Sequence, residues 1–222
     1  MYATINTMRQ KLCELGRLMY DRHLTDSAGG NISARVGEQV CITPRYSGAK
    51  FRWNLKAQQI LVTDLAGNKL DGEGEISRES KVHYRLYREF PTGFGIVHAH
   101  PLNVLVFCAA GIPLQPVLED TLKFGEIGFS EFAPAHSDEL ARSIAEEMHK
   151  KEDALGKQAA AVMAPWHGLF VLGRDIDAAY DAVERLDGNA NILLKCALIA
   201  SPSDFEKRMS MLKDAASRFG KS

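Results

Sequence analysis

The sequence has no surplus of charge, no long apolar run and few cysteines. Its 27 Lys and Arg residues balance 28 Asp and Glu residues, which gives a formal net charge of -1. This balance argues against a partner that is recognised by bulk electrostatics, such as nucleic acid or an anionic membrane surface. The apolar runs are too short to span a bilayer, so no membrane partner is expected.

The four cysteines form no C-x-x-C pair, which disfavours a thiolate metal site and a disulfide framework. They are Cys13, Cys41, Cys108 and Cys196. Residues 1–7 lack a basic segment followed by an apolar one, so we expect no secretory signal peptide. These absences predict a cytoplasmic protein with reduced, buried thiols.

The chain also lacks internal repeats, low-complexity segments and recognisable linkers. Charged residues make up 25% and hydrophobic residues 45% of the 222 positions, which excludes a disordered chain. A chain of this length can bury a substantial core. We therefore expect a single domain over residues 1–222.

Hydrophobic spacing predicts helices at both ends of the chain, with strands and helices interspersed between them. Helices are expected over residues 8–19, 79–89 with Ser77 as N-cap, 102–110, 137–151, 175–200 and 203–219. Strands are expected over residues 39–43, 59–64, 95–100, 160–163 and 169–172. The links between strands are too short for regular βαβ crossovers. The sequence therefore favours a mixed or antiparallel sheet flanked by helices over a Rossmann fold.

Three of the seven histidines stand at the ends of expected strands. His98 and His100 are two residues apart, so their side chains leave a strand from the same face. Two buried imidazoles are costly unless their nitrogens are used, and a divalent transition metal, zinc first, would use them. His167, which precedes a glycine that permits close approach, is the third candidate ligand. Three protein ligands and an open position are typical of catalytic zinc.

The alternative is three unrelated histidines that are satisfied by hydrogen bonds, and a lone H-x-H motif does not decide between the two interpretations. His23, His83, His136 and His149 are interpreted as ordinary histidines. Among them His83 stands out, because it lies four residues after Glu79 on the same expected helical face. Glu79 by itself is interpreted as a carboxylate favoured by the helix dipole.

Five short motifs occur in an order and spacing that resemble the class II aldolase/adducin family over roughly residues 8 to 200. They are Gly30-Asn31-Ile32-Ser33, Ile42-Thr43-Pro44 with Ser47-Gly48, Ser77-Arg78-Glu79 with His83 and Tyr87, His98-Ala99-His100, and His167-Gly168-Leu169. The resemblance implies a three-layer α/β/α sandwich with a mostly antiparallel sheet. It also implies a homotetramer whose active sites lie at subunit interfaces.

The resemblance further implies a zinc ion, with manganese or cobalt as alternatives, held by His98, His100 and His167. The position of Glu79 is the family's acid/base carboxylate, which can approach the metal when substrate is absent. Such a metal stabilises the enediolate left by carbon–carbon cleavage next to a ketone. A carboxylate in a dry site can move the proton if its pKa is raised.

The resemblance also implies a phosphate site. Its positions here are Asn31, Ser47, Gly48 and Ser77. The chain has Ser77-Arg78-Glu79 where the family commonly has Ser-Ser-Glu, and Arg78 can bind a phosphate or a carboxylate in a bidentate manner. A solvated surface arginine is the alternative, so which anion is bound stays open.

Two tyrosines of the family's aldolases and epimerases have no counterpart. Tyr180 is the last tyrosine of the chain, and the segment after the H-x-H helix carries Glu119, Asp120 and Lys123 instead. These three residues are candidates for proton transfer from a neighbouring subunit, or they are ordinary loop charges.

We expect a zinc-dependent lyase that cleaves a small ketose phosphate or a related hydroxy-keto compound into a triose phosphate and an aldehyde. Epimerase, dehydratase and decarboxylase activities of the same family stay open. The rival from another class is an adducin-like interaction module. Such a module would be free to lose the metal-binding histidines and Glu79, which are all present.

Overall fold

The computed structural model describes residues 4–218, and its centre is a seven-stranded sheet with the order β4-β3-β2-β1-β5-β7-β6. Each pairing in this order is antiparallel. The strands are β1 (Asn31–Val36), β2 (Gln39–Ile42), β3 (Leu61–Asp64), β4 (Lys69–Asp71), β5 (Gly95–Ala99), β6 (Ala159–Ala164) and β7 (Gly168–Gly173). The antiparallel alternative predicted from the sequence is confirmed.

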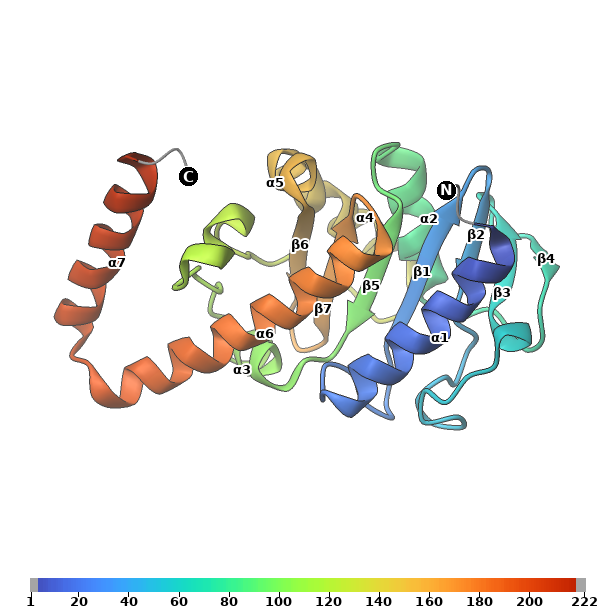
Figure 1. Cartoon of the computed structure of the whole chain (residues 1–222), viewed down its shortest axis with the longest axis horizontal. Helices are drawn as coiled ribbons and strands as arrows, with labels where there is room; N and C mark the ends of the chain where they lie inside the picture. The colour runs from blue at the N-terminus through green and yellow to red at the C-terminus, as the bar shows by residue number, and fades with distance from the viewer. Residues whose placement is uncertain (1–3, 219–222) are drawn as a thin grey trace.

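Helices cover both faces of the sheet, as the α/β/α prediction required (Figure 1). One face packs against α1 (Ile5–Asp21), α3 (Leu102–Ala110) and α6 (Ile176–Ile199). The other packs against α2 (Ser80–Glu89), α4 (Asp138–His149) and α5 (Glu152–Lys157). Two short 3₁₀ helices, η1 (Ala57–Gln59) and η2 (Glu119–Phe124), lie in connecting segments.

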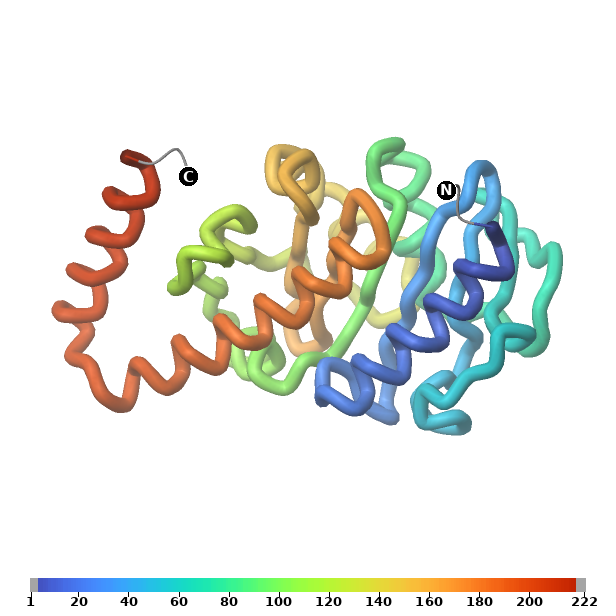
Figure 2. The backbone as a smooth tube through the Cα atoms, viewed as in Figure 1, coloured from blue at the N-terminus to red at the C-terminus, as the bar shows by residue number. Residues whose placement is uncertain are grey.

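The last helix, α7 (Pro202–Arg218), extends away from the sheet (Figure 2). Of its residues, only Ala216 is buried. None of the helices within residues 4–218 is long and apolar enough to cross a membrane.

Side-chain alternation along β5 positions the candidate site. Val97 and Ala99 belong to the core under α1 and α6, whereas Ile96 belongs to the core under α2 and α4. His98 alternates with its neighbours and therefore points to the same face as Ile96. A polar side chain is thus placed at the end of a strand whose five residues are all buried.

The structure corrects the predicted start of the second helix. Ser77 is not its N-cap, because α2 begins at Ser80 and Glu79 occupies the cap position. The Ser77 hydroxyl instead accepts a hydrogen bond from Asn31 Nδ2 at 3.2 Å, and its carbonyl accepts one from the Ser80 amide at 3.1 Å. The same hydroxyl also accepts a hydrogen bond from the Glu79 amide at 3.4 Å, so Ser77 links the segment before α2 to β1.

Among the strands and α-helices, the sequence did not predict the central strand β1, which pairs with β2 and β5, or two shorter elements, β4 and α5. β4 has three exposed residues and forms through pairing with β3, and α5 has only six residues. Neither carries enough apolar periodicity to be recognised locally, because both depend on contacts with neighbouring elements.

Candidate active site

His98 lies on β5 with its side chain fully buried. Its ring stacks on Phe170 of β7, with centroids 4.0 Å apart and an interplanar angle of 9°. Nδ1 lies 3.1 Å from the Leu169 carbonyl oxygen, so that nitrogen donates to the backbone. Nε2 points into the site, where it lies 3.0 Å from Glu79 Oε2.

His100 follows directly after β5. Its Nδ1 lies 3.3 Å from Asp26 Oδ1, and this carboxylate oxygen also accepts hydrogen bonds from the Ala28 and Gly29 amides. Nε2 is buried and has no hydrogen-bond partner in the described part of the chain. Burial first, and then the nearby His98, lowers the pKa of His100 to about 4, so the ring is neutral at pH 7, as a metal ligand must be.

His167 comes from the tight turn between β6 and β7, where its amide donates to the Ala164 carbonyl. Gly168 next to it allows the turn to pass close to β5. A Cβ atom at Gly168 would lie 2.7 Å from the Ala99 carbonyl oxygen and 2.7 Å from His100 Cδ2. Only glycine therefore lets the two strand ends come together here.

The three imidazoles converge as the sequence predicted. One ligand atom from each of His98, His100 and His167 can be chosen so that all lie within 4.8 Å of one another. Nε2 of His98 faces Glu79, and Nε2 of His100 is buried without a hydrogen-bond partner within residues 4–218. The other nitrogen of each ring is fixed by a carbonyl or a carboxylate. Such outer partners orient the imidazoles that bind metals. The residues present therefore fit a divalent transition metal.

Glu79 faces this cluster and is 5% exposed. Its Oε2 lies 3.0 Å from His98 Nε2, and its Oε1 lies 3.1 Å from His167 Nε2. Burial alone would raise the pKa of this carboxyl group, but the charges and hydrogen bonds of His98 and His167 outweigh burial and hold the pKa well below its ordinary value. Glu79 is therefore ionised, because the neighbouring imidazoles reverse the effect that a dry site has by itself.

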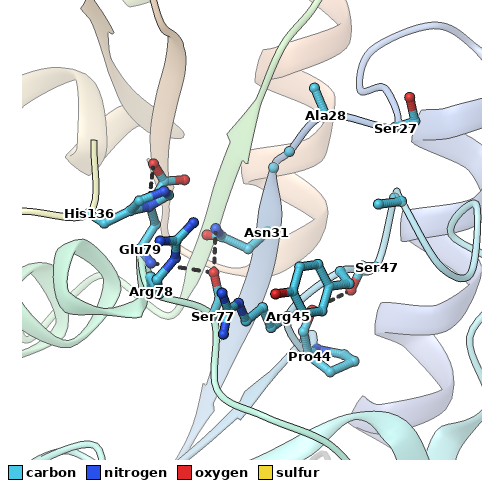
Figure 3. Close-up of a pocket in the computed structure, with 15 residues that line it drawn as sticks. Ser27, Ala28, Asn31, Pro44, Arg45, Ser47, Ser77, Arg78, Glu79 and His136 are labelled. Atoms are coloured by element: carbon cyan, nitrogen blue, oxygen red, sulfur yellow. Dashed lines mark hydrogen bonds and ion pairs between the residues drawn. The ribbon is translucent and has the colours of Figure 1, made fainter. Parts of the chain in front are cut away.

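The residues predicted for an anion site line one pocket of about 140 Å³ together with Glu79 (Figure 3). They are Asn31, Ser47, Gly48, Ser77 and Arg78. Asn31 Oδ1 is buried without a hydrogen-bond partner in the part of the chain described. Ser47 Oγ donates to the Pro44 carbonyl at 2.6 Å, and Arg78 is exposed. The pocket thus offers polar groups and a cationic side chain next to the imidazole cluster.

Glu119, Asp120 and Lys123 do not line this pocket. They lie on η2, where Asp120 pairs with Arg185 at 2.7 Å and Lys123 hydrogen-bonds to Gln158. Their predicted role concerns the site of a neighbouring subunit and stays a prediction.

Two residues of the site were missed by sequence reasoning. Asp26 orients His100, and the signal for it is the Asp26-Ser27-Ala28-Gly29 turn, which places a carboxylate beside backbone amides. His136 lies in the pocket with Nδ1 3.4 Å from Glu79 Oε1. Nothing in the local sequence marks His136, because only tertiary packing brings residues 79 and 136 together.

His83 is predicted to make the protein less stable in acid. Its side chain is fully buried in α2, with Nδ1 2.6 Å from Ser33 Oγ. Burial, reinforced by His98 and opposed by Glu79, lowers its pKa from 6.5 to about 3. Between these values the unfolded chain binds a proton that the folded chain does not, so the free energy of unfolding falls by about 1.4 kcal/mol for each pH unit of acidification.

Urea unfolding of the wild-type protein and of His83→Gln between pH 7 and pH 4 checks this expectation. The free energy of unfolding should depend less steeply on pH in the variant. His23→Gln, at an exposed histidine, is the control and should keep the wild-type slope. Equal slopes in the wild-type protein and in His83→Gln would contradict the assignment.

Known proteins match this chain over most of its length. Residues 10–194 match the family model described as Class II Aldolase and Adducin N-terminal domain. An L-fuculose phosphate aldolase from Methanococcus maripaludis is 30% identical over 183 residues, which cover 82% of this chain and 92% of that protein.

Solved structures of similar proteins have the same fold. An L-fuculose 1-phosphate aldolase superposes with a TM-score of 0.78 at 25% sequence identity, covering 96% of this chain and 98% of its own. The l-fuculose-1-phosphate aldolase from Thermus thermophilus superposes with a TM-score of 0.71 at 25% identity, covering 88% of this chain and 97% of its own.

The family match extends over both the imidazole cluster and the pocket beside it. It confirms the resemblance carried by the five sequence motifs, and the antiparallel sheet agrees with the structures of the relatives. The chain therefore belongs to the class II aldolase/adducin family.

Proposed function

We propose that the protein is a zinc-dependent aldolase that cleaves a small ketose phosphate into a triose phosphate and an aldehyde. The observation that carries this proposal is the convergence of three imidazoles and one buried carboxylate at a pocket lined by polar side chains. The similarity to L-fuculose phosphate aldolases supports a sugar phosphate as the substrate class.

His98, His100 and His167 would hold the metal in this proposal. A bound divalent metal supplies a Lewis acid that stabilises negative charge developing on the ketose oxygens. Leu169 and Asp26 keep two of the imidazoles in the required orientation through the hydrogen bonds at their Nδ1 atoms.

Glu79 is the acid/base residue of the proposal. When the carbon–carbon bond breaks, its electron pair stays on the carbon next to the ketone, and that carbon must then receive a proton. The carboxylate is buried beside the imidazole cluster, within reach of a substrate bound there. Because Glu79 is ionised in the structure, it has to gain a proton before it can deliver one.

The phosphate would lie in the pocket beside Glu79. Asn31, Ser47 and Ser77 contribute polar groups there, and Gly48 lies where a side chain does not fit. A Cβ atom at Gly48 would approach the Asp26 carbonyl oxygen to 2.5 Å. Arg78 adds a positive charge to the pocket, where it can pair with the phosphate. The chain as a whole carries almost no net charge, so attraction of the phosphate depends on such local groups.

A substrate panel tests the proposal. The zinc-loaded protein is assayed on ketose 1-phosphates, on ribulose 5-phosphate and on hydroxy-keto acids, with detection of triose phosphate and carbon dioxide. We expect triose phosphate from a ketose 1-phosphate, and we expect its formation to stop on chelation and to return with zinc. Epimerised ribulose 5-phosphate, carbon dioxide without triose phosphate, or turnover that survives complete metal removal would contradict the proposal.

A further inference from the structure

His136 lies in the pocket beside Glu79 and has no part in the function proposed above (Figure 3). Its Nδ1 approaches Glu79 Oε1 to 3.4 Å and is buried without another partner among the described residues. The side chain as a whole is 37% exposed and lines the same pocket as Asn31 and Ser77. One ring nitrogen therefore faces the carboxylate, while part of the imidazole stays open to a molecule in the pocket.

The backbone holds His136 in a conformation that suits glycine better than histidine. Its φ is 68°, in the left-handed region, which is unfavourable for a residue with a Cβ atom. Two hydrogen bonds of Ser137 fix this turn. Its amide donates to the Pro134 carbonyl, and its hydroxyl accepts from the Leu140 amide as the N-cap of α4. This strain persists because the cap and the turn fix the backbone, and the ring points at Glu79 as a result.

The charges around His136 favour its neutral form. Burial lowers the pKa of its imidazole below the ordinary value, Arg78, His167 and Arg45 lower it further, and Glu79 opposes them. In the neutral ring, an Nδ1–H that points at the carboxylate leaves a lone pair on Nε2. His136 can therefore accept a proton at Nε2 while it gives one up at Nδ1.

We propose that His136 is a second acid/base residue, which takes the proton of the substrate hydroxyl at cleavage and passes it through Glu79 to carbon. This inference rests on the proposed aldol cleavage. Nε2 accepts the hydroxyl proton as the carbon–carbon bond breaks and that oxygen becomes the aldehyde carbonyl. The electron pair of the bond stays on the carbon next to the ketone.

The Nδ1 proton then passes to Glu79 Oε1, and Glu79 delivers it to that carbon. One proton leaves the hydroxyl oxygen and one reaches carbon, and nothing is oxidised or reduced. The imidazole returns to its first tautomer by proton exchange with water. The relay supplies from within the chain a group for the hydroxyl proton, and Glu79 Oε1, 3.4 Å from His136 Nδ1, is placed to pass a proton on to carbon.

Two partial reactions separate this role from a structural one. Cleavage of the ketose phosphate requires both His136 and Glu79 in the relay. Exchange of the carbon-bound proton of dihydroxyacetone phosphate with deuterium oxide, followed by NMR, requires Glu79 alone. The variants are His136→Gly, which suits the φ of 68°, and His136→Asn, since asparagine tolerates the left-handed region. The matched control is His23→Gly, at an exposed histidine with a φ of 57°.

We expect both His136 variants to lower kcat for cleavage by about 100-fold or more, within the range of general acid–base catalysis. Proton exchange should stay within about threefold of wild type, and added imidazole should restore part of the cleavage rate of His136→Gly. His23→Gly should change neither reaction. Parallel loss of cleavage and exchange, which indicates that His136 only positions Glu79, would overturn the proposal, as would unchanged cleavage.

The His136–Glu79 contact has a test that needs no turnover. NMR titration of the zinc-loaded protein should give a lower pKa for His136 in Glu79→Gln than in the wild type, because the carboxylate that raises it is gone. An unchanged pKa would mean that the two residues do not interact, which would overturn the relay. Wild-type protein that neither cleaves nor exchanges would instead overturn the proposed function, so the two failures are distinguishable.

Discussion

His98→Ala is expected to lose stoichiometric divalent metal and to lower kcat/KM for cleavage by at least about 1,000-fold. The ring is fully buried, its Nδ1 is hydrogen-bonded to the Leu169 carbonyl, and its Nε2 points into the cluster, 3.0 Å from Glu79 Oε2. His100 and His167 already serve as ligands in the proposal, so neither can replace that nitrogen. A metal left with two imidazoles loses both affinity and a fixed position.

Metal analysis after refilling with zinc, together with steady-state kinetics, checks this result. His98 also stacks on Phe170, so its removal leaves a cavity that can lower stability. His167→Ala avoids this difficulty, because that side chain is 20% exposed and lies in a turn. The control is His149→Ala on the distant surface of α4, which should keep its metal. Full metal retention in His98→Ala and His167→Ala would contradict the metal site.

Glu79→Gln is expected to lower kcat for cleavage by about 100- to 10,000-fold while the protein keeps its metal. Glutamine has nearly the same shape, so it fills the buried position, but it cannot take up and deliver a proton. The imidazole ligands remain, and the loss therefore affects proton transfer and leaves the metal site intact. The same variant should also abolish proton exchange on dihydroxyacetone phosphate.

The matched control is Glu73→Gln, an exposed carboxylate six residues earlier in the chain. Its kinetics should equal those of the wild type. Thermal unfolding of all variants shows whether the fold is kept, and metal analysis shows whether the site is filled. Unchanged turnover in Glu79→Gln, or loss of metal in parallel with activity, would show that Glu79 is not the acid/base residue.

The sequence predicted the cluster of three histidines because its signal is local. Alternation along a strand places His98 and His100 on one face, and a glycine after His167 marks the close approach that the structure shows at Gly168. The order of the five motifs predicted the family, which the family match confirms. The pairing of the strands was harder to predict. The short links between strands excluded regular βαβ crossovers, but they allowed both a mixed and an antiparallel sheet, and only the observed strand order decided between the two.

The sequence could not show which side chains meet across the site. Ser77 is placed as a helix cap by its local sequence, but in the structure its hydroxyl accepts from Asn31, and the helix starts at Ser80. Glu79 was expected to have a raised pKa if the site is dry, yet the contacts with His98 and His167 lower it. Both outcomes depend on groups far away in the chain, whose distances no local pattern contains.

The sequence by itself determined the periodic helices and strands, the choice of the three candidate histidines and the family. Strand alternation, glycines at the ends of elements and the order of motifs can all be recognised from residues that are neighbours in the chain. Only the tertiary structure decided the orientation of the imidazoles by Leu169 and Asp26, and the approach of His136 to Glu79. The physical reason is that hydrogen bonds and burial act over a few ångströms in space. Residues 79 and 136 come within that range only after the sheet and its helices have packed.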